Sequence, residues 1–109
     1  MSSVAGTWSL TIDSPLGKQH ANVNLTQNPD QSWQGQAHDL GSGEKTVMYD
    51  IVIEGDKVGW KQQITKPMKL KLNYNLTFDG ERLTGKVKAG LFPASKVVGE
   101  RVSEDAVAS

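Results

Sequence analysis

The chain has 109 residues, which is enough for one domain with one modest hydrophobic core. Its 12 basic residues balance 12 acidic residues, so it has no overall positive charge with which to attract nucleic acid or an anionic membrane surface. The absence of cysteine excludes a disulfide framework, a thiolate nucleophile and a zinc–thiolate site.

The opening stretch, "MSSVAGTW", has neither the basic segment nor the apolar stretch of a secretion signal. No apolar run approaches the roughly 20 residues of a membrane-spanning helix. We therefore expect a cytoplasmic protein with neither a membrane nor a nucleic-acid partner.

Apolar and polar residues alternate along most of the chain, and no convincing helical period appears. This period of two is typical of a strand with one buried face and one wet face. We expect eight strands, over residues 6–12, 21–26, 33–37, 47–53, 58–64, 68–78, 83–89 and 94–102. Their spacing of about twelve residues is typical of a sandwich or a barrel.

The connections between these strands are of two kinds. Compact turns such as "IEGDKV" and "FDGERL" follow the second, fourth and sixth strands, whereas mostly longer loops follow the first, third, fifth and seventh. Alternate connections of an up-and-down sheet lie at opposite ends. We therefore predict an all-β, eight-stranded antiparallel up-and-down barrel over residues 1–102, followed by a flexible tail at 103–109, with functional loops at the irregular end.

The two terminal strands carry a large ring and a cation that this topology brings together. Trp8 lies near the beginning of the first strand, and Arg101 lies near the end of the last, "KVVGERV". In a closed barrel these strands pair antiparallel, so the guanidinium stacks on the indole, bonds nearby carbonyl groups and plugs that end. The alternative is an ordinary core tryptophan and a solvated arginine.

Gly6, Trp8 and Arg101 together resemble the calycin superfamily, which includes the lipocalins, avidins and fatty-acid-binding proteins. Those proteins share an N-terminal Gly-x-Trp and an arginine from the last strand packed across the ring. The resemblance implies a structural plug and an internal ligand cavity. This chain is shorter than a transport lipocalin and lacks its helix and cysteines, so a compact lipocalin-like or avidin-like barrel fits better.

Alternation places a mostly apolar and aromatic set of side chains on the inner wall, as in small-molecule pockets. The expected ligand-binding residues are Trp33, Tyr49, Trp60, Gln62, Met68, Leu70, Tyr74 and Phe92. Apart from Arg101 the inward phase carries no clear cation, so we expect a neutral or weakly polar hydrophobic ligand. The alternative is that these side chains fill the interior.

Asp39 shares the inward phase near the irregular end. A carboxyl held there in apolar surroundings would have its charged form disfavoured, which suits a general acid or base. Tyr49, Tyr74 or Gln62 could then polarise a substrate carbonyl, with His38 as a secondary candidate. Such a site would serve a cofactor-independent isomerase, cyclase or lyase. The alternative is that Asp39 only bonds the backbone of the turn "DLGSG".

His38 and His20 share the outward phase of neighbouring strands, where they would form an incomplete metal site. We expect neither a metal nor another cofactor. An outer stripe of lysines, with Lys61, Lys71 and Lys88 among its members, is expected to be solvated.

Three functions follow from the sequence. The first is an intracellular barrel that binds a small hydrophobic molecule, and the second is the enzyme based on Asp39. The third is a filled barrel that binds a partner protein through its outer surface. A homodimer through an outer face with Val52 and Val97 is possible in any of them.

Overall fold

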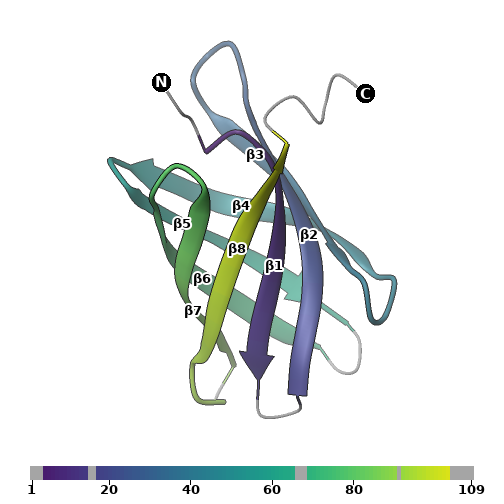
Figure 1. Ribbon diagram of the computed structural model, residues 1–109. Coiled ribbons are helices and arrows are strands. Elements are labelled where there is room, and N and C mark those ends of the chain that lie inside the picture. The colour runs from purple at the N-terminus through teal and green to yellow at the C-terminus, as the bar shows by residue number, and fades with distance from the viewer. Residues whose placement is uncertain (1–3, 15–16, 66–68, 91, 104–109) are drawn as a thin grey trace.

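The computed structural model describes residues 4–14, 17–65, 69–90 and 92–103 of the chain. Eight strands form a closed antiparallel barrel in which each strand pairs with the next and β8 returns to β1 (Figure 1). The strands are β1 (Gly6–Ser14), β2 (Gly17–Gln27), β3 (Trp33–Asp39), β4 (Lys45–Glu54), β5 (Lys57–Ile64), β6 (Leu70–Phe78), β7 (Arg82–Ala89) and β8 (Ser95–Ser103). The predicted fold class is confirmed. The last strand includes Ser103, and the rest of the predicted tail lies outside the described residues.

Alternation along the strands builds a single core inside the barrel. The buried hydrophobic residues are Val4, Trp8, Leu10, Ile12, Val23, Leu25, Ala37, Met48, Val58, Trp60, Tyr74, Leu76, Leu83, Val87 and Val97. The inward phase predicted for β1, β2, β3, β5 and the described part of β6 is confirmed by their burial patterns. Closure of the sheet removes the exposed edges that would otherwise invite pairing with other chains.

A bulge in β4 changes the side of the sheet on which its side chains lie. Tyr49 pairs with Lys61 and Val52 pairs with Gly59, so two residues of β4 oppose one residue of β5. Asp50, within the bulge, has a φ of 50°, a left-handed conformation that aspartate tolerates better than most residues.

By alternation, an inward Tyr49 implies that Val47, Ile51 and Ile53 also face inward, and for Val47 and Tyr49 this prediction is wrong. Their exposed fractions are 67% and 40%, whereas Met48 between them is only 3% exposed. Beyond the bulge, Ile51 and Ile53 pack against the core as predicted. The extra residue exchanges the two faces of the strand, because side chains alternate strictly only while the pairing is regular.

Val97 was expected on the outer face, and this prediction is also wrong. It is completely buried and lies opposite Ile12 of β1 and Gly85 of β7. Val97 and Arg101 are four residues apart on β8, and every second side chain of a strand lies on the same face. Since Arg101 faces inward, Val97 faces inward as well.

Gly85 permits a close approach between two strands of the barrel wall. A Cβ atom added there would overlap the Asn75 carbonyl oxygen and lie 2.8 Å from the Leu76 Cα atom. Because both neighbours belong to the backbone of β6, no side-chain rotation relieves the overlap.

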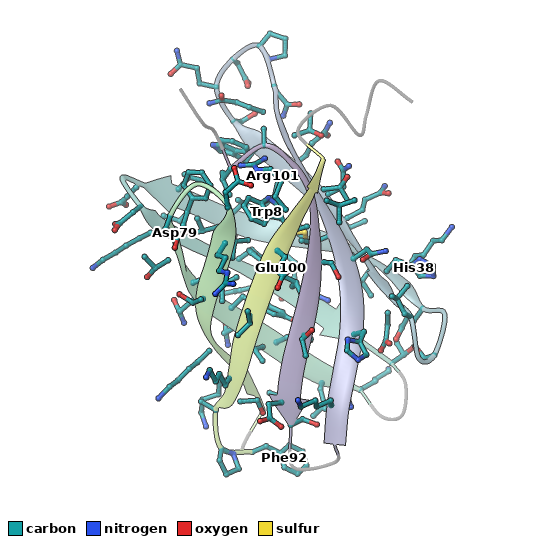
Figure 2. The ribbon with its side chains drawn as sticks, viewed as in Figure 1. Trp8, His38, Asp79, Phe92, Glu100 and Arg101 are labelled. Atoms are coloured by element: carbon teal, nitrogen blue, oxygen red, sulfur yellow. The ribbon has the colours of Figure 1, made fainter. Side chains whose placement is uncertain are left out.

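The two ends of the barrel differ as the connections predict. The β2–β3, β4–β5 and β6–β7 hairpins lie at the end that carries Trp8 and Arg101, which we call the closed end. Phe92, in the β7–β8 connection, lies at the opposite, open end (Figure 2). Among the described residues, no helix has the length and hydropathy needed to cross a membrane.

Candidate functional site: a cavity at the open end

At the closed end, an arginine packs over the Trp8 ring and beside the Phe78 ring. The Arg101 guanidinium carbon lies 4.4 Å from the centre of the Trp8 ring and 5.8 Å from that of Phe78 (Figure 2). Trp8 and Phe78 meet edge to face, with ring centres 5.8 Å apart. The predicted stacking of Arg101 on Trp8 is confirmed.

Backbone carbonyl groups complete this end. Arg101 donates from Nη1 to the Ala5 oxygen at 3.0 Å and from Nε to the Gly80 oxygen at 3.2 Å. The Trp8 indole donates to the Val4 oxygen at 2.8 Å, which holds the start of the described chain across the barrel. The indole, the guanidinium and three carbonyl groups thus satisfy one another at this end.

The open end contains a cavity of about 730 Å³. Its lining comes from residues near the open ends of the strands and from the loops that join them. The lining residues are Ile12, Ser14, Lys18, Gln19, His20, Asp39, Leu40, Gly41, Ser42, Ile64, Leu70, Leu72, Tyr74, Val87, Ala89, Phe92, Pro93 and Ser95. Most of the inner wall is apolar, and the volume lies in the range of small-molecule sites.

A stacked pair of aromatic rings lies at the inner end of this cavity. The rings of Trp60 and Tyr74 have centres 4.6 Å apart and an interplanar angle of 17°. On β5 and β4, the Trp60 indole donates to Gln62 Oε1 at 2.9 Å, and Gln62 Nε2 donates to Thr46 Oγ1 at 3.2 Å. Because its indole, amide and hydroxyl groups satisfy one another, this buried polar chain forms a fixed support for Tyr74.

The Tyr74 hydroxyl is the one polar group of this aromatic pair that no protein group uses. Tyr74 is only 4% exposed, and within the described chain its hydroxyl has no hydrogen bond. No side-chain polar atom of the described residues is both sealed from the surface and unpartnered, so the hydroxyl reaches the cavity that Tyr74 lines. Burial and the negative charge of Asp39 raise the pKa of Tyr74 above the usual range of a phenol, so the group remains a neutral donor.

Asp39 lies at the rim and organises the β3–β4 loop. Its Oδ1 atom accepts hydrogen bonds from the Gly41 amide at 2.8 Å and from the Ser42 amide at 3.4 Å. Its backbone carbonyl accepts from Gly43 at 2.8 Å. The structural role weighed for Asp39 from the sequence is therefore present, and the same side chain also lines the cavity.

Two further contacts shape the rim. The Glu44 carboxylate accepts from the Thr65 amide at 3.0 Å and from the Thr65 hydroxyl at 2.6 Å, which ties the β3–β4 loop to the end of β5. Lys88 donates from Nζ to the Phe92 carbonyl oxygen at 2.9 Å. The Phe92 ring lines the cavity and is still 46% exposed, so it stands at the entrance.

The structure places the predicted site residues in different parts of the barrel. Asp39, Leu70, Tyr74 and Phe92 line the cavity, whereas Trp60, which stacks on Tyr74, and Gln62, which bonds Trp60, are not part of the lining. Trp33 packs near the closed end, because β3 begins there. Met68 lies outside the described residues.

Two residues proposed to assist Asp39 do not lie in the cavity lining. Tyr49 is on the outer surface because of the bulge in β4, and this corrects its predicted place in the site. His38 projects from the outer side of the barrel, where its neighbours in the sheet are Asn22 and Lys45 (Figure 2). Neither can act on a ligand inside the barrel from these positions.

Sequence reasoning missed part of the site. Lys18, His20, Leu40, Ser42 and Ser95 contribute to the rim although they were not assigned to it. The sequence signal that could have found them is their position next to the irregular loops, because outward residues beside these loops can border the entrance to the cavity. Among the residues that the structure describes, no three His, Asp or Glu side chains group to hold a metal ion.

Comparison of the chain with protein-family models, with curated proteins and with solved structures finds no match. The geometry of the cavity is therefore the guide to function.

Proposed function

We propose that this protein binds a small hydrophobic molecule, neutral or weakly polar, in the cavity at the open end of the barrel. The observation that carries the proposal is a cavity of about 730 Å³ with a largely apolar wall in a chain whose other end is plugged by its own side chains. A soluble molecule that buried this wall would gain about 25 cal/mol for each Å² of apolar surface removed from water.

The distribution of charge supports an uncharged ligand. Lys18, His20 and Asp39 are the titratable side chains other than tyrosine in the described lining, and Lys18 and His20 are exposed at the rim. The part of the inner wall that the structure describes offers no cation to a carboxylate or a phosphate. A buried anion without a partner is strongly disfavoured, so a charged ligand would have to keep its charge at the entrance.

The closed end supports a relationship to the calycins. Gly6, Trp8 and Arg101 lie as the resemblance implies, on paired terminal strands of an eight-stranded barrel. We therefore include membership of that superfamily in the proposal. The cytoplasmic location and the homodimer stay predictions from the sequence.

Binding of a neutral fluorescent probe tests this function. N-phenyl-1-naphthylamine emits strongly only in apolar surroundings, and titration into the protein is expected to give a saturable rise in emission. Amide shifts in a two-dimensional NMR spectrum are expected to gather at the open ends of β1, β6 and β7.

Two leucine substitutions on the same strand provide the matched pair. Ala89→Leu adds volume to the cavity wall and is expected to weaken binding, whereas Lys86→Leu adds apolar surface outside the barrel and is expected to leave binding unchanged. Shifts gathered on the outer face, or equal effects of the two substitutions, would contradict the proposal.

A further inference from the structure

The inner end of the cavity holds a hydrogen-bond donor without an acceptor, and this feature bears on the chemistry of the ligand. The Tyr74 phenol is nine-tenths buried, lines the cavity and has no hydrogen bond in the described part of the chain. The hydroxyl itself is not sealed from the cavity, so its acceptor has to come from what fills the cavity, either water or a ligand.

The surroundings of Tyr74 keep its ring in place. Trp60 covers one face of the ring at a centre-to-centre distance of 4.6 Å, and Gln62 and Thr46 hold Trp60 in turn. The neighbouring residues across the sheet are Trp60 on β5 and Val87 on β7, so the phenol stands in an apolar wall. A donor fixed in this way needs little reorganisation to meet a ligand atom.

Electrostatics at this position favour an uncharged acceptor. The negative charge of Asp39 acts on the Tyr74 hydroxyl, and with burial it disfavours a phenolate there. A ligand carboxylate at the same place would meet the same repulsion and the same loss of hydration. An oxygen that carries no net charge accepts the hydrogen bond without either cost.

We infer that the cavity selects hydrophobic molecules that carry an uncharged carbonyl or ether oxygen at their inner end, where the Tyr74 hydroxyl donates a hydrogen bond to it. This inference rests on the proposed function and adds to it a chemical group and an orientation. The apolar body of the ligand lies along Leu70, Leu72 and Val87, and any charged end lies at the rim.

Three naphthalene probes of similar size separate the possibilities. They are 2-acetylnaphthalene, 2-ethylnaphthalene and 2-naphthoate, which carry a ketone, a hydrocarbon group and a carboxylate. Dissociation constants are measured by NMR titration for the unmodified protein, for Tyr74→Phe and for Tyr49→Phe. Tyr49 is the matched control because it is the chain's other tyrosine and lies outside the barrel.

We expect Tyr74→Phe to weaken binding of the ketone about fivefold, the effect of one neutral hydrogen bond, and to leave the hydrocarbon unchanged. Tyr49→Phe is expected to change neither. Any binding of the carboxylate is expected to be insensitive to Tyr74→Phe, because its charge stays at the rim.

The carbonyl carbon of bound 2-acetylnaphthalene gives a direct readout. With carbon-13 at this position, the resonance is expected downfield in the unmodified protein, and to move upfield in Tyr74→Phe as the hydrogen bond is lost. Thermal unfolding checks that Tyr74→Phe remains folded, which we expect because the hydroxyl bonds no described residue.

The outcomes separate the two proposals. If ketone and hydrocarbon both bind, and Tyr74→Phe changes them equally or not at all, the inference is overturned and the proposed function stands. If the carboxylate depends on Tyr74 as strongly as the ketone does, the preference for an uncharged oxygen is wrong. If no probe binds the unmodified protein, the proposed function and the inference fall together.

Discussion

The two ends of this barrel are built from the same strands and satisfy their polar groups in different ways. At the closed end, the Trp8 indole and the Arg101 guanidinium bond carbonyl groups of the chain itself. At the open end, the ring of Tyr74 is buried, but its hydroxyl has no protein partner in the described chain and faces a cavity. Where the protein satisfies its own groups it gains stability, and where it leaves one unused it can bind something else.

Truncation of the large ring at each end should show this contrast most strongly. Trp8→Ala removes a completely buried indole and is expected to lower the free energy of unfolding by about 3–5 kcal/mol. Phe92→Ala removes a half-exposed ring at the entrance and is expected to cost less than about 1 kcal/mol, while it weakens ligand binding. Urea unfolding measures both, and similar losses for the two would contradict the division of roles.

The next largest effect concerns the cation of the closed end. Arg101→Met keeps an unbranched apolar stem but removes the hydrogen bonds to Ala5 and Gly80 and the stacking on Trp8. We expect a loss of about 2 kcal/mol of stability with ligand affinity unchanged. Arg82→Met, at the chain's other arginine, is the exposed control, and an equal loss there would show that the contacts of Arg101 are unimportant.

At the open end, Tyr74 is expected to make the free energy of unfolding depend on pH in alkaline solution. The pKa of Tyr74 is raised in the folded protein, so above the ordinary phenol pKa of about 10 the unfolded chain releases a proton that the folded chain keeps. The contribution of Tyr74 is complete below about pH 10 and is lost as pH rises, by at most about 1.4 kcal/mol per pH unit. Chemical unfolding between pH 9 and about pH 11 should show a steeper loss than in Tyr74→Phe. Equal slopes would mean that the hydroxyl is hydrated in the folded state.

The smallest expected effect concerns the bulge in β4, between the two ends of the barrel. Asp50→Val places a β-branched residue at a φ of 50° and is expected to cost about 1 kcal/mol relative to the unmodified protein. Asp50→Gly, which suits this conformation, is expected to be nearly neutral despite the loss of the exposed ion pair with Lys61. If valine and glycine were equally tolerated in thermal unfolding, the bulge would not depend on a left-handed residue.

The bulge also explains where prediction from the sequence stopped. In "VMYDIVI" both phases are apolar around Val47, Met48 and Tyr49, so alternation does not specify a face. A single extra residue at Asp50 then reverses the faces of the first half of the strand. Regular segments such as "KLNYNLTF" leave no such choice, because every second residue is polar, and the prediction for them is confirmed.

The cavity, too, was predicted only in part, because some of its features depend on local sequence and others do not. The sequence indicated that Asp39 faces inward near the irregular end and that Tyr74 faces inward deeper in the barrel, since phase and connection lengths are local properties. It did not indicate that Trp60 is covered by Tyr74, or that Trp33 lies near the other end of the interior. Depth along a barrel depends on the stagger between strands, which is set by pairing between distant segments.

The sequence by itself determined eight alternating strands, two unlike sets of connections and the meeting of Trp8 with Arg101, because each follows from local period and strand order. Only the tertiary structure decided which aromatic side chains support the cavity and which line it. It also left the Tyr74 hydroxyl without a partner among the described residues, because satisfaction of a polar group depends on all the neighbours that folding brings within reach.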